Sequence, residues 1–587
     1  MSTNSHSVVD PKISAPFFGS DAIAALLRST QVPFIAINPG ASFRGLHDSI
    51  VNFLGNRQPQ LLLTLHEAQA VAIAHGYAKV TGQPLAVVLH ANVGLMNAVM
   101  AIYDAWVDRV PMLILGATGS VDAARRRPWI EWIHTSRDQA ALVRHFVKWD
   151  DQPASLPAAL ESIVRAWLIT RTAPCAPVYI CLDVDIQERE IPGCTEAAAL
   201  PVPLLSNYAL PTQPRPAESD LVTAAKLLEQ AQKPLILVGR HLRGNEQWSR
   251  RIQFAEATGA AVICDLKCGV GFPNPHPQFV GAPAQYLDTE SITALDAADV
   301  IVSLDWPDLA GLLASRPDQG KNARVIVVSA DERLHNGWSF DHFGLPRSEL
   351  RIPVPADVLV TELLPRLKRR SRASWYRKST KPQSTAASGP ITLTDLARAF
   401  EKARGDELIC LTRVPFGWPE HLTRFDSALD CIGYDGGGGI GSTPGLTVGA
   451  ALALKGSGRL PVAILGDGDL LMGSQALWTA AAERLPALFI INNNHSFYND
   501  VEHQERVAAR RGRPVGNSHI GMSISEPQID LPGLARAHGL QSFGPIKKRE
   551  DLDKSLADAL QMARQGATVL LDVDIPPGLP SAPAKAN

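Results

Sequence analysis

Short apolar runs alternate with amphipathic, helix-like patterns along most of this 587-residue chain. The first third carries six such elements, with strands expected at 33–37, 60–65, 84–90 and 111–117 and helices at 67–80 and 94–107. Apolar runs that lack polar alternation are typical of strands buried on both faces, as in a parallel sheet. The pattern therefore predicts α/β architecture.

The same alternation returns in two later blocks. The expected strands are 234–239, 260–266, 299–305 and 323–330, then 407–410, 460–466, 487–493 and 568–574. A Pro-rich stretch and a basic, Ser/Thr/Pro-rich stretch separate the blocks, and such composition is typical of linkers. We predict three doubly wound parallel-sheet domains at 1–195, 215–365 and 391–587, with a surface linker at 366–390.

Charge and composition narrow the class of protein. The 56 Lys and Arg residues nearly balance the 58 Asp and Glu residues, whereas a nucleic-acid-binding protein usually shows a basic excess. The seven cysteines contain no CxxC pair, which favours reduced thiols over a zinc site. No apolar stretch reaches the roughly 18 residues of a membrane span, and residues 1–14 lack the features of a signal peptide. We therefore expect a cytoplasmic protein that binds neither nucleic acid nor membrane.

The stretch GDGDLLMGSQALWTAAAERLPALFIINNN, residues 466–494, carries candidate chemistry. We expect Asp467 and Gly468 to form the turn out of a strand, a helix over 470–485, and a second strand that ends in asparagines. Parallel strands end at the same edge of a sheet, so Asp467 and Asn494 should emerge together where such sheets bind ligands.

Carboxylate, amide and backbone carbonyl oxygens suit Mg²⁺ or Ca²⁺, and Mg²⁺ commonly completes its coordination with phosphates. Gly466 and Gly468 would let the backbone approach such phosphates at the start of the helix. A tight turn with a capping aspartate explains the same spacing, and the spacing alone leaves both interpretations open.

GDG followed by NN at this distance resembles the cofactor motif of thiamine diphosphate (ThDP) enzymes. The resemblance implies that Asp467, Asn494 and the backbone carbonyl of Ser496 bind Mg²⁺, and that Gly466, Gly468 and Asp469 lie at the cofactor. Asp469 departs from the family, which usually has serine or another small residue there. Its carboxylate would either approach the cofactor or point to solvent.

The stretch LHEAQAVAIAHGYAK, residues 65–79, resembles the segment of these enzymes that carries an activating glutamate. The resemblance assigns this role to Glu67, which would protonate the aminopyrimidine ring of ThDP. An apolar pocket suits such a group because burial favours a protonated carboxyl. An acid at the start of a helix, stabilised by the helix dipole, is the structural alternative.

Both halves of the chain resemble the benzoylformate decarboxylase and acetolactate synthase branch. His90, in LHANVG, matches an active-site histidine that transfers protons, although a strand-end histidine could also be structural. That branch has a substrate-binding serine after NPG, where this chain has Ala41 and then Ser42. Benzoylformate decarboxylases, the part of the branch to which the serine belongs, also have a second catalytic histidine late in the middle domain, and residues 303–313 contain none.

Further residues follow from the resemblance. Gly439 and Ile440 lie in YDGGGGIGSTPG, residues 434–445, which resembles the loop that supports the thiazolium ring. The family's substrate channel corresponds to residues 495–514, so the candidate specificity residues are Tyr498, Asn499, Asp500 and Val501. The arginines at 506, 510, 511 and 513 could bind a carboxylate or a coenzyme A phosphate, or be a solvated helix end. RRRPW at 125–129 has the same two interpretations.

The predicted function is a ThDP- and Mg²⁺-dependent decarboxylase or carboligase of 2-oxo acids, aromatic ones included, acting through a ThDP ylid and a carbanion/enamine intermediate. Its partners would be a 2-oxo acid, an aldehyde acceptor and further copies of the chain, as a homodimer or homotetramer with active sites at the interface. An acetolactate-type synthase, a 2-hydroxyacyl-CoA lyase and a non-catalytic paralogue remain open. An NAD-dependent dehydrogenase is the alternative of another class, and GGGGIG is only a weak dinucleotide fingerprint. FAD in the middle domain also stays open.

Overall fold

The computed structural model describes residues 15–283, 286–316, 323–334, 344–368, 374–377 and 389–577. The chain forms two compact units. Unit 1 is Met1–Gln213 with Arg333–His342, and unit 2 is Pro214–Glu332 with Phe343–Asn587. Three sheets are present, one in unit 1 and two in unit 2, and every pairing between their named strands is parallel. The predicted fold class is thereby confirmed.

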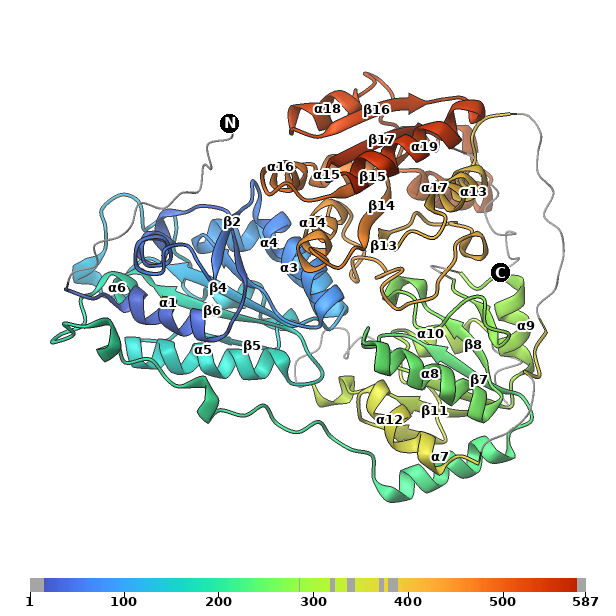
Figure 1. The fold of residues 1–587 in the computed structure, drawn as a ribbon, viewed down its shortest axis with the longest axis horizontal. Helices are drawn as coiled ribbons and strands as arrows, with labels where there is room; N and C mark the ends of the chain where they lie inside the picture. Colours follow the sequence, from blue (N-terminus) through green and yellow to red (C-terminus); the bar gives the residue numbers. More distant parts are fainter. Residues whose placement is uncertain are drawn as a thin grey trace. The chain divides into compact units, whose positions relative to one another are not determined.

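Unit 1 is a six-stranded sheet in the order β2-β1-β3-β4-β6-β5. Its strands are β1 (Phe34–Ile37), β2 (Gln60–Leu63), β3 (Ala86–Leu89), β4 (Met112–Thr118), β5 (Trp149–Asp151) and β6 (Pro177–Asp183). Its α-helices are α1 (Gly19–Ser29), α2 (Arg44–Asp48), α3 (Glu67–Thr81), α4 (Ala91–Val107), α5 (Leu156–Arg171) and α6 (Val184–Glu188). Within this unit, α1 and α5 lie on one face of the sheet and α3 and α4 on the other (Figure 1). The central strands are buried on both faces, as their continuous apolar runs predict.

The middle sheet has the order β12-β11-β10-β7-β8-β9. Its strands are β7 (Pro234–Val238), β8 (Ala261–Cys264), β9 (Phe279–Gly281), β10 (Val300–Leu304), β11 (Arg324–Val328) and β12 (Leu350–Ile352). One face packs against α7 (Glu218–Gln230), α8 (Asn245–Thr258) and α12 (Ala356–Leu363), and the other against α9 (Thr289–Ala297) and α10 (Leu309–Ala314). Most of the predicted linker 366–390 lies outside the described residues. Its described part is not all solvent-exposed, because Tyr376 is buried and Trp375 Nε1 donates a hydrogen bond to Pro234 O at 2.8 Å.

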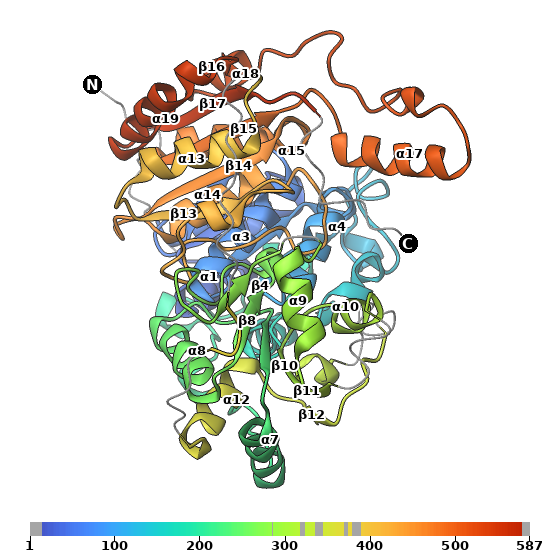
Figure 2. The same ribbon diagram turned by 90° about the vertical axis from the view of Figure 1, so that its right-hand side faces the viewer.

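The third sheet has the order β13-β14-β15-β17-β16. Its strands are β13 (Ile409–Arg413), β14 (Leu460–Gly466), β15 (Ala487–Asn493), β16 (Gln541–Ile546) and β17 (Thr568–Asp574). The helices are α13 (Leu393–Arg404), α14 (Thr443–Ala453), α15 (Asp467–Gly473), α16 (Gln475–Ala482), α17 (Tyr498–Arg510), α18 (Leu531–Ala537) and α19 (Arg549–Arg564). Helices α13 and α19 pack on one face of the sheet, and α16 and α18 on the other. Helix α17 stands away from the sheet (Figure 2).

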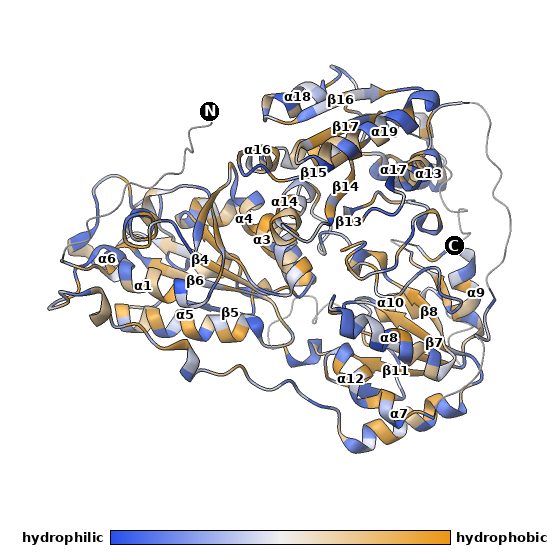
Figure 3. Cartoon of the chain, viewed as in Figure 1, coloured by the Kyte–Doolittle hydropathy of each residue, from blue (hydrophilic) through white to orange (hydrophobic). Residues whose placement is uncertain are grey.

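Hydropathy follows the layers of the fold. The strands at the centre of each sheet are mostly hydrophobic, while the helices carry hydrophilic residues on their outer sides (Figure 3). One continuous core of buried side chains includes residues of both sheets of unit 2, from Ile236 in β7 to Leu571 in β17. The domain boundaries expected at 195, 215, 365 and 391 stay a prediction. Within the part of the chain that the structure describes, no helix combines the length and apolar character needed to span a bilayer.

Candidate active site

The first group of predicted site residues lies at the carboxyl edge of the sheet in unit 1. Ser42 follows β1, Glu67 follows β2 and His90 follows β3, and these strands are neighbours in the order β2-β1-β3. From β1 the chain adds β2 on one side of the sheet and then β3 and β4 on the other, so the strand order changes direction between β1 and β3. Open α/β sheets bind ligands outside the carboxyl ends of the strands at such a reversal. The topology therefore gathers these residues at a ligand-binding edge.

Glu67 is the first residue of α3 and is only 7 % exposed. The imidazole Nδ1 of His66 caps the helix by accepting a hydrogen bond from Ala68 N at 3.1 Å. The side-chain amide of Asn97 donates to Glu67 Oε2 at 3.0 Å. Gly94, in the first turn of α4, lies close to this carboxyl, since a Cβ built there would be 3.4 Å from Glu67 Oε1. The carboxyl is thus buried and held by a neutral donor.

His90 is held on two sides by the turn after β1. The hydroxyl of Ser42 lies 2.8 Å from His90 Nδ1, and Ser42 itself is buried. A Cβ built at Gly40 would overlap the His90 ring, so only glycine fits at this position. The NPGAS segment therefore acts on His90: Gly40 makes room for the ring, Ser42 orients it and Ala41 is exposed. A substrate contact for Ala41 or Ser42 stays a prediction.

A second histidine, which sequence reasoning missed, lies beside His90. The ring of His134 is 4.7 Å from the ring of His90, with 65° between the ring planes. Burial lowers the pKa of His90, and the nearby charges of His134 and Arg127 lower it further, against the opposing effect of Glu67. His90 is therefore neutral at neutral pH. No motif marks His134 in the sequence, because the long loop after β4 alone brings it to this edge.

The arginines of RRRPW have structural partners. Arg127 Nε lies 2.7 Å from Glu131 Oε1, and Arg126 Nε donates to Ser120 O at 3.2 Å. Arg125 forms an ion pair with Asp185 at 3.1 Å. Neither the solvated basic end nor the anion-binding site describes this run, because its arginines make internal contacts within the loop and with Asp185.

The second group of site residues lies at the carboxyl edge of the third sheet, in unit 2. Strands β14 and β15 are parallel neighbours with Gly466 opposite Asn492, as predicted. Asp467 is buried, and this burial raises its pKa, whereas hydrogen bonds from backbone N–H groups, that of Ser496 included, lower it. The side-chain oxygen of Asn494 accepts a hydrogen bond from Ser496 N at 3.1 Å. Asp467, Asn494 and Ser496 are thus brought together.

This edge has the shape and the donor chemistry for a diphosphate and Mg²⁺. A Cβ built at Gly466 would meet no atom within 4 Å, so the backbone faces open space there. A Cβ at Gly468 would lie 2.7 Å from the Phe497 ring, which explains the second glycine by packing. The described residues contain no cluster of three or more His, Cys, Asp or Glu side chains suited to a metal. The predicted set has one carboxylate and two carbonyl-type oxygens, and Mg²⁺ accepts so few protein ligands when phosphates supply the others.

Two expectations about residues 467–485 are wrong. The helix begins at Asp467 itself, with Gly466 as its extended N-cap residue, so Asp467 and Gly468 are not a turn outside it. The predicted single helix is also two helices, α15 and α16, separated at Ser474. Gly473 and Ser474 are poor helix formers, and such a pair commonly breaks a helix.

Asp469 does not point to solvent. It is buried, and its Oδ1 accepts a hydrogen bond from Gly441 N at 2.7 Å. Its Oδ2 accepts one from Thr443 Oγ1 at 2.6 Å. Asp469 therefore holds the end of the loop that contains Gly439 and Ile440, of which Ile440 is the residue expected beneath the thiazolium ring. Ile440 is 37 % exposed, so its side chain is accessible at the surface of the loop.

The predicted specificity residues begin α17. Val501 is buried, Tyr498 and Asn499 are half-buried, and Asp500 is exposed. The four arginines predicted either to bind an anion or to be solvated are all exposed, and Arg506 Nε donates to Glu502 O at 3.1 Å. Their exposure fits the solvated helix end.

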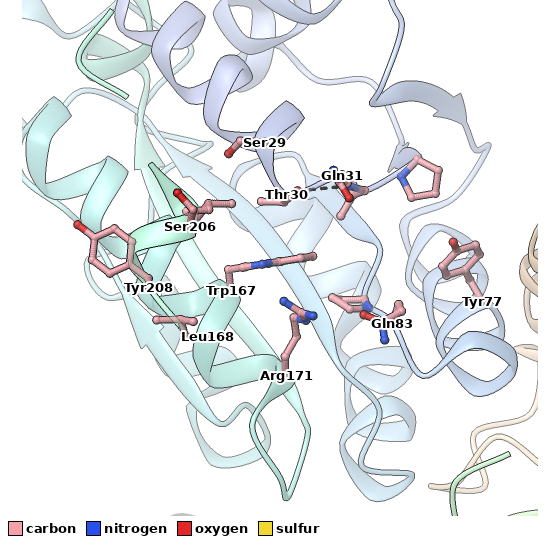
Figure 4. Close-up of a pocket in the computed structure, with 14 residues that line it drawn as sticks. Ser29, Thr30, Gln31, Tyr77, Gln83, Trp167, Leu168, Arg171, Ser206 and Tyr208 are labelled. Carbon is pink, nitrogen blue, oxygen red and sulfur yellow. Dashed lines mark hydrogen bonds between the residues drawn. The ribbon is translucent and has the colours of Figure 1, made fainter. Parts of the chain in front are cut away.

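One pocket of about 450 Å³ lies in unit 1 (Figure 4). Val32, Pro33 and Pro84 line it, and they precede β1 and β3, so it lies at the amino edge of the sheet. Arg171, stacked 4.8 Å from the Trp167 ring centroid, also lines it. None of the predicted site residues is among its lining residues.

The middle sheet reverses its strand order between β7 and β10, where a nucleotide would bind in such a fold. Three charged side chains follow the strands at this point. Arg240 lies 3.4 Å from Asp305 and 2.8 Å from Asp331. This ion-pair network lies at the position that a nucleotide would use in such a fold.

Three consecutive family models match the chain. They are the N-terminal TPP-binding domain of thiamine pyrophosphate enzymes at residues 18–142, the central domain at 221–333 and the C-terminal TPP-binding domain at 416–573. This chain belongs to the thiamine pyrophosphate enzyme family. Thiamine pyrophosphate is the ThDP of the sequence analysis, and both ThDP-binding domains are present, one containing Glu67 and His90 and the other Asp467 and Asn494.

Relatives within the family have several activities. Benzoylformate decarboxylase of Pseudomonas aeruginosa is 25 % identical over 528 residues, which cover 87 % of this chain and 91 % of that protein. The acetolactate synthase large subunit of Lactococcus lactis is 24 % identical over 586 residues, covering 96 % and 93 %. Benzoylformate decarboxylase from Polynucleobacter necessarius has the same fold, with a TM-score of 0.79 at 20 % identity over 96 % of this chain and 99 % of that one. The structure of a 4-hydroxybenzoylformate decarboxylase of Rhodococcus jostii has a TM-score of 0.77 at 20 % identity, over 95 % of this chain and 99 % of that one.

Proposed function

We propose that this chain is a ThDP- and Mg²⁺-dependent decarboxylase or carboligase of 2-oxo acids. The observation that carries the proposal is the arrangement at the carboxyl edge of unit 1. A buried glutamate and an oriented, neutral histidine lie there, in a chain that belongs to a ThDP family. The relatives named as decarboxylases of benzoylformate and as acetolactate synthases favour a 2-oxo acid as the substrate class.

Each part of the cofactor has candidate residues. Asp467, Asn494 and the Ser496 carbonyl would hold Mg²⁺, and the open space at Gly466 would receive the diphosphate. Glu67 would protonate the aminopyrimidine ring. When bound, ThDP supplies a nucleophilic carbon for a keto group and accepts the electrons that CO₂ leaves behind.

His90 is the proposed proton-transfer residue. Its neutral ring accepts a proton on Nε2 while Nδ1 faces the Ser42 hydroxyl, which fixes the ring orientation. The charge of His134 lowers the pKa of His90, and the two rings are in contact, with their centroids 4.7 Å apart. His134, in unit 1, is therefore the candidate for the second catalytic histidine, which residues 303–313 of the middle domain do not contain.

A homodimer or homotetramer with active sites at the subunit interface is part of the proposal, as is a cytoplasmic location. The exposed apolar side chains of Val93, Met96 and Met100 on α4 support association, because such a surface usually meets a partner. Analytical ultracentrifugation at several protein concentrations measures the assembly. A monomer throughout would refute this part.

Cofactor binding is the first test. The protein is stripped with a chelator, and ThDP is titrated with and without Mg²⁺ while tryptophan fluorescence is followed. We expect saturable ThDP binding that requires the metal and is lost in Asp467→Asn. The matched control is Asp183→Asn, which changes another buried acid at a strand end, in unit 1. Metal-independent binding, or none, contradicts the proposed site.

The reaction is the second test. A panel of 2-oxo acids is supplied alone, with aldehydes, and beside a set of 2-hydroxyacyl-CoAs, and CO₂ release and product masses are measured. CO₂ release from a 2-oxo acid that Glu67→Gln abolishes supports the proposal. Cleavage of a 2-hydroxyacyl-CoA without CO₂ release would assign the lyase activity instead. Reduction of a 2-oxo acid to the 2-hydroxy acid, seen only when NADH is added, would assign the dehydrogenase.

A further inference from the structure

The loop of residues 435–441, DGGGGIG, has little of its own to hold it in one conformation. Five of its seven residues are glycine. Gly436, Gly438 and Gly441 have φ values of +79°, +78° and +101°, a region that other residues rarely adopt. Glycine loses more conformational freedom on ordering than any other residue, so interactions outside the loop must fix it.

Two buried carboxylates hold the loop from opposite ends. Asp435 Oδ1 accepts a hydrogen bond from Gly438 N at 3.1 Å. Asp469 Oδ1 accepts one from Gly441 N at 2.7 Å, and its Oδ2 accepts a second from Thr443 Oγ1 at 2.6 Å. Hydrogen bonds from backbone N–H groups to a carboxylate are stronger than those between neutral groups. Both bonds therefore act on the backbone on either side of Ile440.

Arg413, the last residue of β13, joins the two carboxylates. Its Nη1 lies 3.0 Å from Asp435 Oδ2 and its Nε 4.0 Å from Asp469 Oδ2. The guanidinium carbon lies 4.3 Å from the centroid of the Tyr434 ring. Arg413, Asp435 and Asp469 are all buried. Buried charges are stable only with such partners, so the three side chains fix one another as a unit.

This network ties the loop to the helix that starts at the candidate metal ligand. Asp467 and Asp469 are two residues apart in α15, so about 200° of helical rotation separates their side chains. Asp467 therefore faces Ser496 while Asp469 faces the loop. A Cβ built at Gly441 would lie 2.9 Å from Met472 Cβ, so the loop end also packs directly on α15.

We propose that Asp469 is a positioning residue that, with Arg413 and Asp435, holds the loop 435–441 so that Ile440 supports the ring of ThDP. This inference rests on the proposed cofactor site. It gives a role to the acid that departs from the family pattern: Asp469 does not touch the cofactor but sets the place of Ile440 relative to Asp467.

Two variants test the network in the full-length protein. Asp469→Asn removes the charge at similar volume, and Thr443→Val removes one hydrogen bond but keeps the charge. The control, Asp357→Asn, changes another buried acid paired with a buried arginine, Arg251, in the middle block. In the cofactor-free protein we expect hydrogen exchange at residues 436–443 to rise about 10-fold or more in Asp469→Asn, less in Thr443→Val, and not in the control. Unchanged exchange in both loop variants overturns the inference.

A double-mutant cycle on cofactor affinity tests the route through Ile440. Ile440→Ala and Asp469→Asn should each weaken ThDP binding, by about 10-fold to 100-fold, as measured by fluorescence titration with Mg²⁺. If Asp469 acts by placing Ile440, Ile440→Ala has little further effect in the Asp469→Asn protein. Effects that multiply overturn the positioning role. If the parent protein binds no ThDP, the proposed function fails, while the exchange experiment still decides whether the network orders the loop.

Discussion

Ser42 can act either on the substrate or on His90, and its geometry favours His90. Its hydroxyl lies 2.8 Å from His90 Nδ1 and the residue is buried, so Ser42→Ala removes one neutral hydrogen bond without opening the site. Such a bond contributes about 1 kcal/mol, which corresponds to a roughly 5-fold loss in rate. A general acid–base group itself contributes about 10²-fold to 10⁴-fold. We therefore expect Ser42→Ala to lower kcat modestly and His90→Ala to lower it far more.

The assay is a double-mutant cycle on CO₂ release from the best 2-oxo acid. Because Ser42 acts through His90, Ser42→Ala should change kcat by less than about 2-fold when His90 is already alanine. Ser49→Ala is the matched control, since Ser49 is a buried serine in the same unit that hydrogen-bonds Asp21 at 2.7 Å. A rise in KM that is equal in both backgrounds would refute the reasoning and make Ser42 a substrate contact.

Two further predictions concern charge. His134→Asn removes a charge that lowers the pKa of His90, so the acid limb of the kcat/KM profile should move to higher pH. The shift should be partial, because burial of His90 lowers its pKa more than His134 does. An acid limb at the same pH in the variant would contradict the coupling between the two histidines. Burial raises the pKa of Asp108, but Lys79 and His75 lower it by more, to about 2 against 3.8. Ionised Asp108 thus stabilises the fold above about pH 4 by about 2 kcal/mol, and this is lost as the pH falls towards 2. Lys79→Met breaks the ion pair with Asp108 and should lower the free energy of unfolding, measured in urea at pH 7, by about 3–5 kcal/mol. The pH at which acid unfolds the protein should also rise. Unchanged urea and acid midpoints would contradict this prediction.

The sequence predicted the fold well because buried parallel strands have a strong local signal. Runs such as 460–466 and 487–493 appear as β14 and β15 at the same bounds. Strands that are short or partly exposed have no such signal, and the prediction omits β5, β9, β12 and β16 for this reason. It also omits β6, although this seven-residue strand is buried throughout. The division into two compact units was equally out of reach, because it depends on contacts between blocks.

The same distinction applies to the residues of the candidate site, because only some of them lie at positions that a local sequence pattern marks. Glu67, His90, Asp467 and Asn494 each directly follow a strand or start a helix, so topology alone brings them to a carboxyl edge. His134 lies in a long loop whose path is set by its own ion pairs, such as that of Arg127 with Glu131. No periodicity or spacing in the sequence describes such a path.

The stretch GDGD shows how one misplaced boundary changes the meaning of a residue. If Asp467 and Gly468 formed a turn, the orientation of Asp469 would be undetermined, and an extra acid beside a metal site would be expected in solvent. Because α15 instead begins at Asp467, helical rotation sends the two carboxylates to opposite sides, one towards Ser496 and the other towards Gly441. The same helical turn can therefore serve two purposes, with its first acid available to a metal and its third holding the loop. Serine in place of Asp469 could accept one of these hydrogen bonds but could not form the ion pair with Arg413, so the carboxylate is what links the loop to β13.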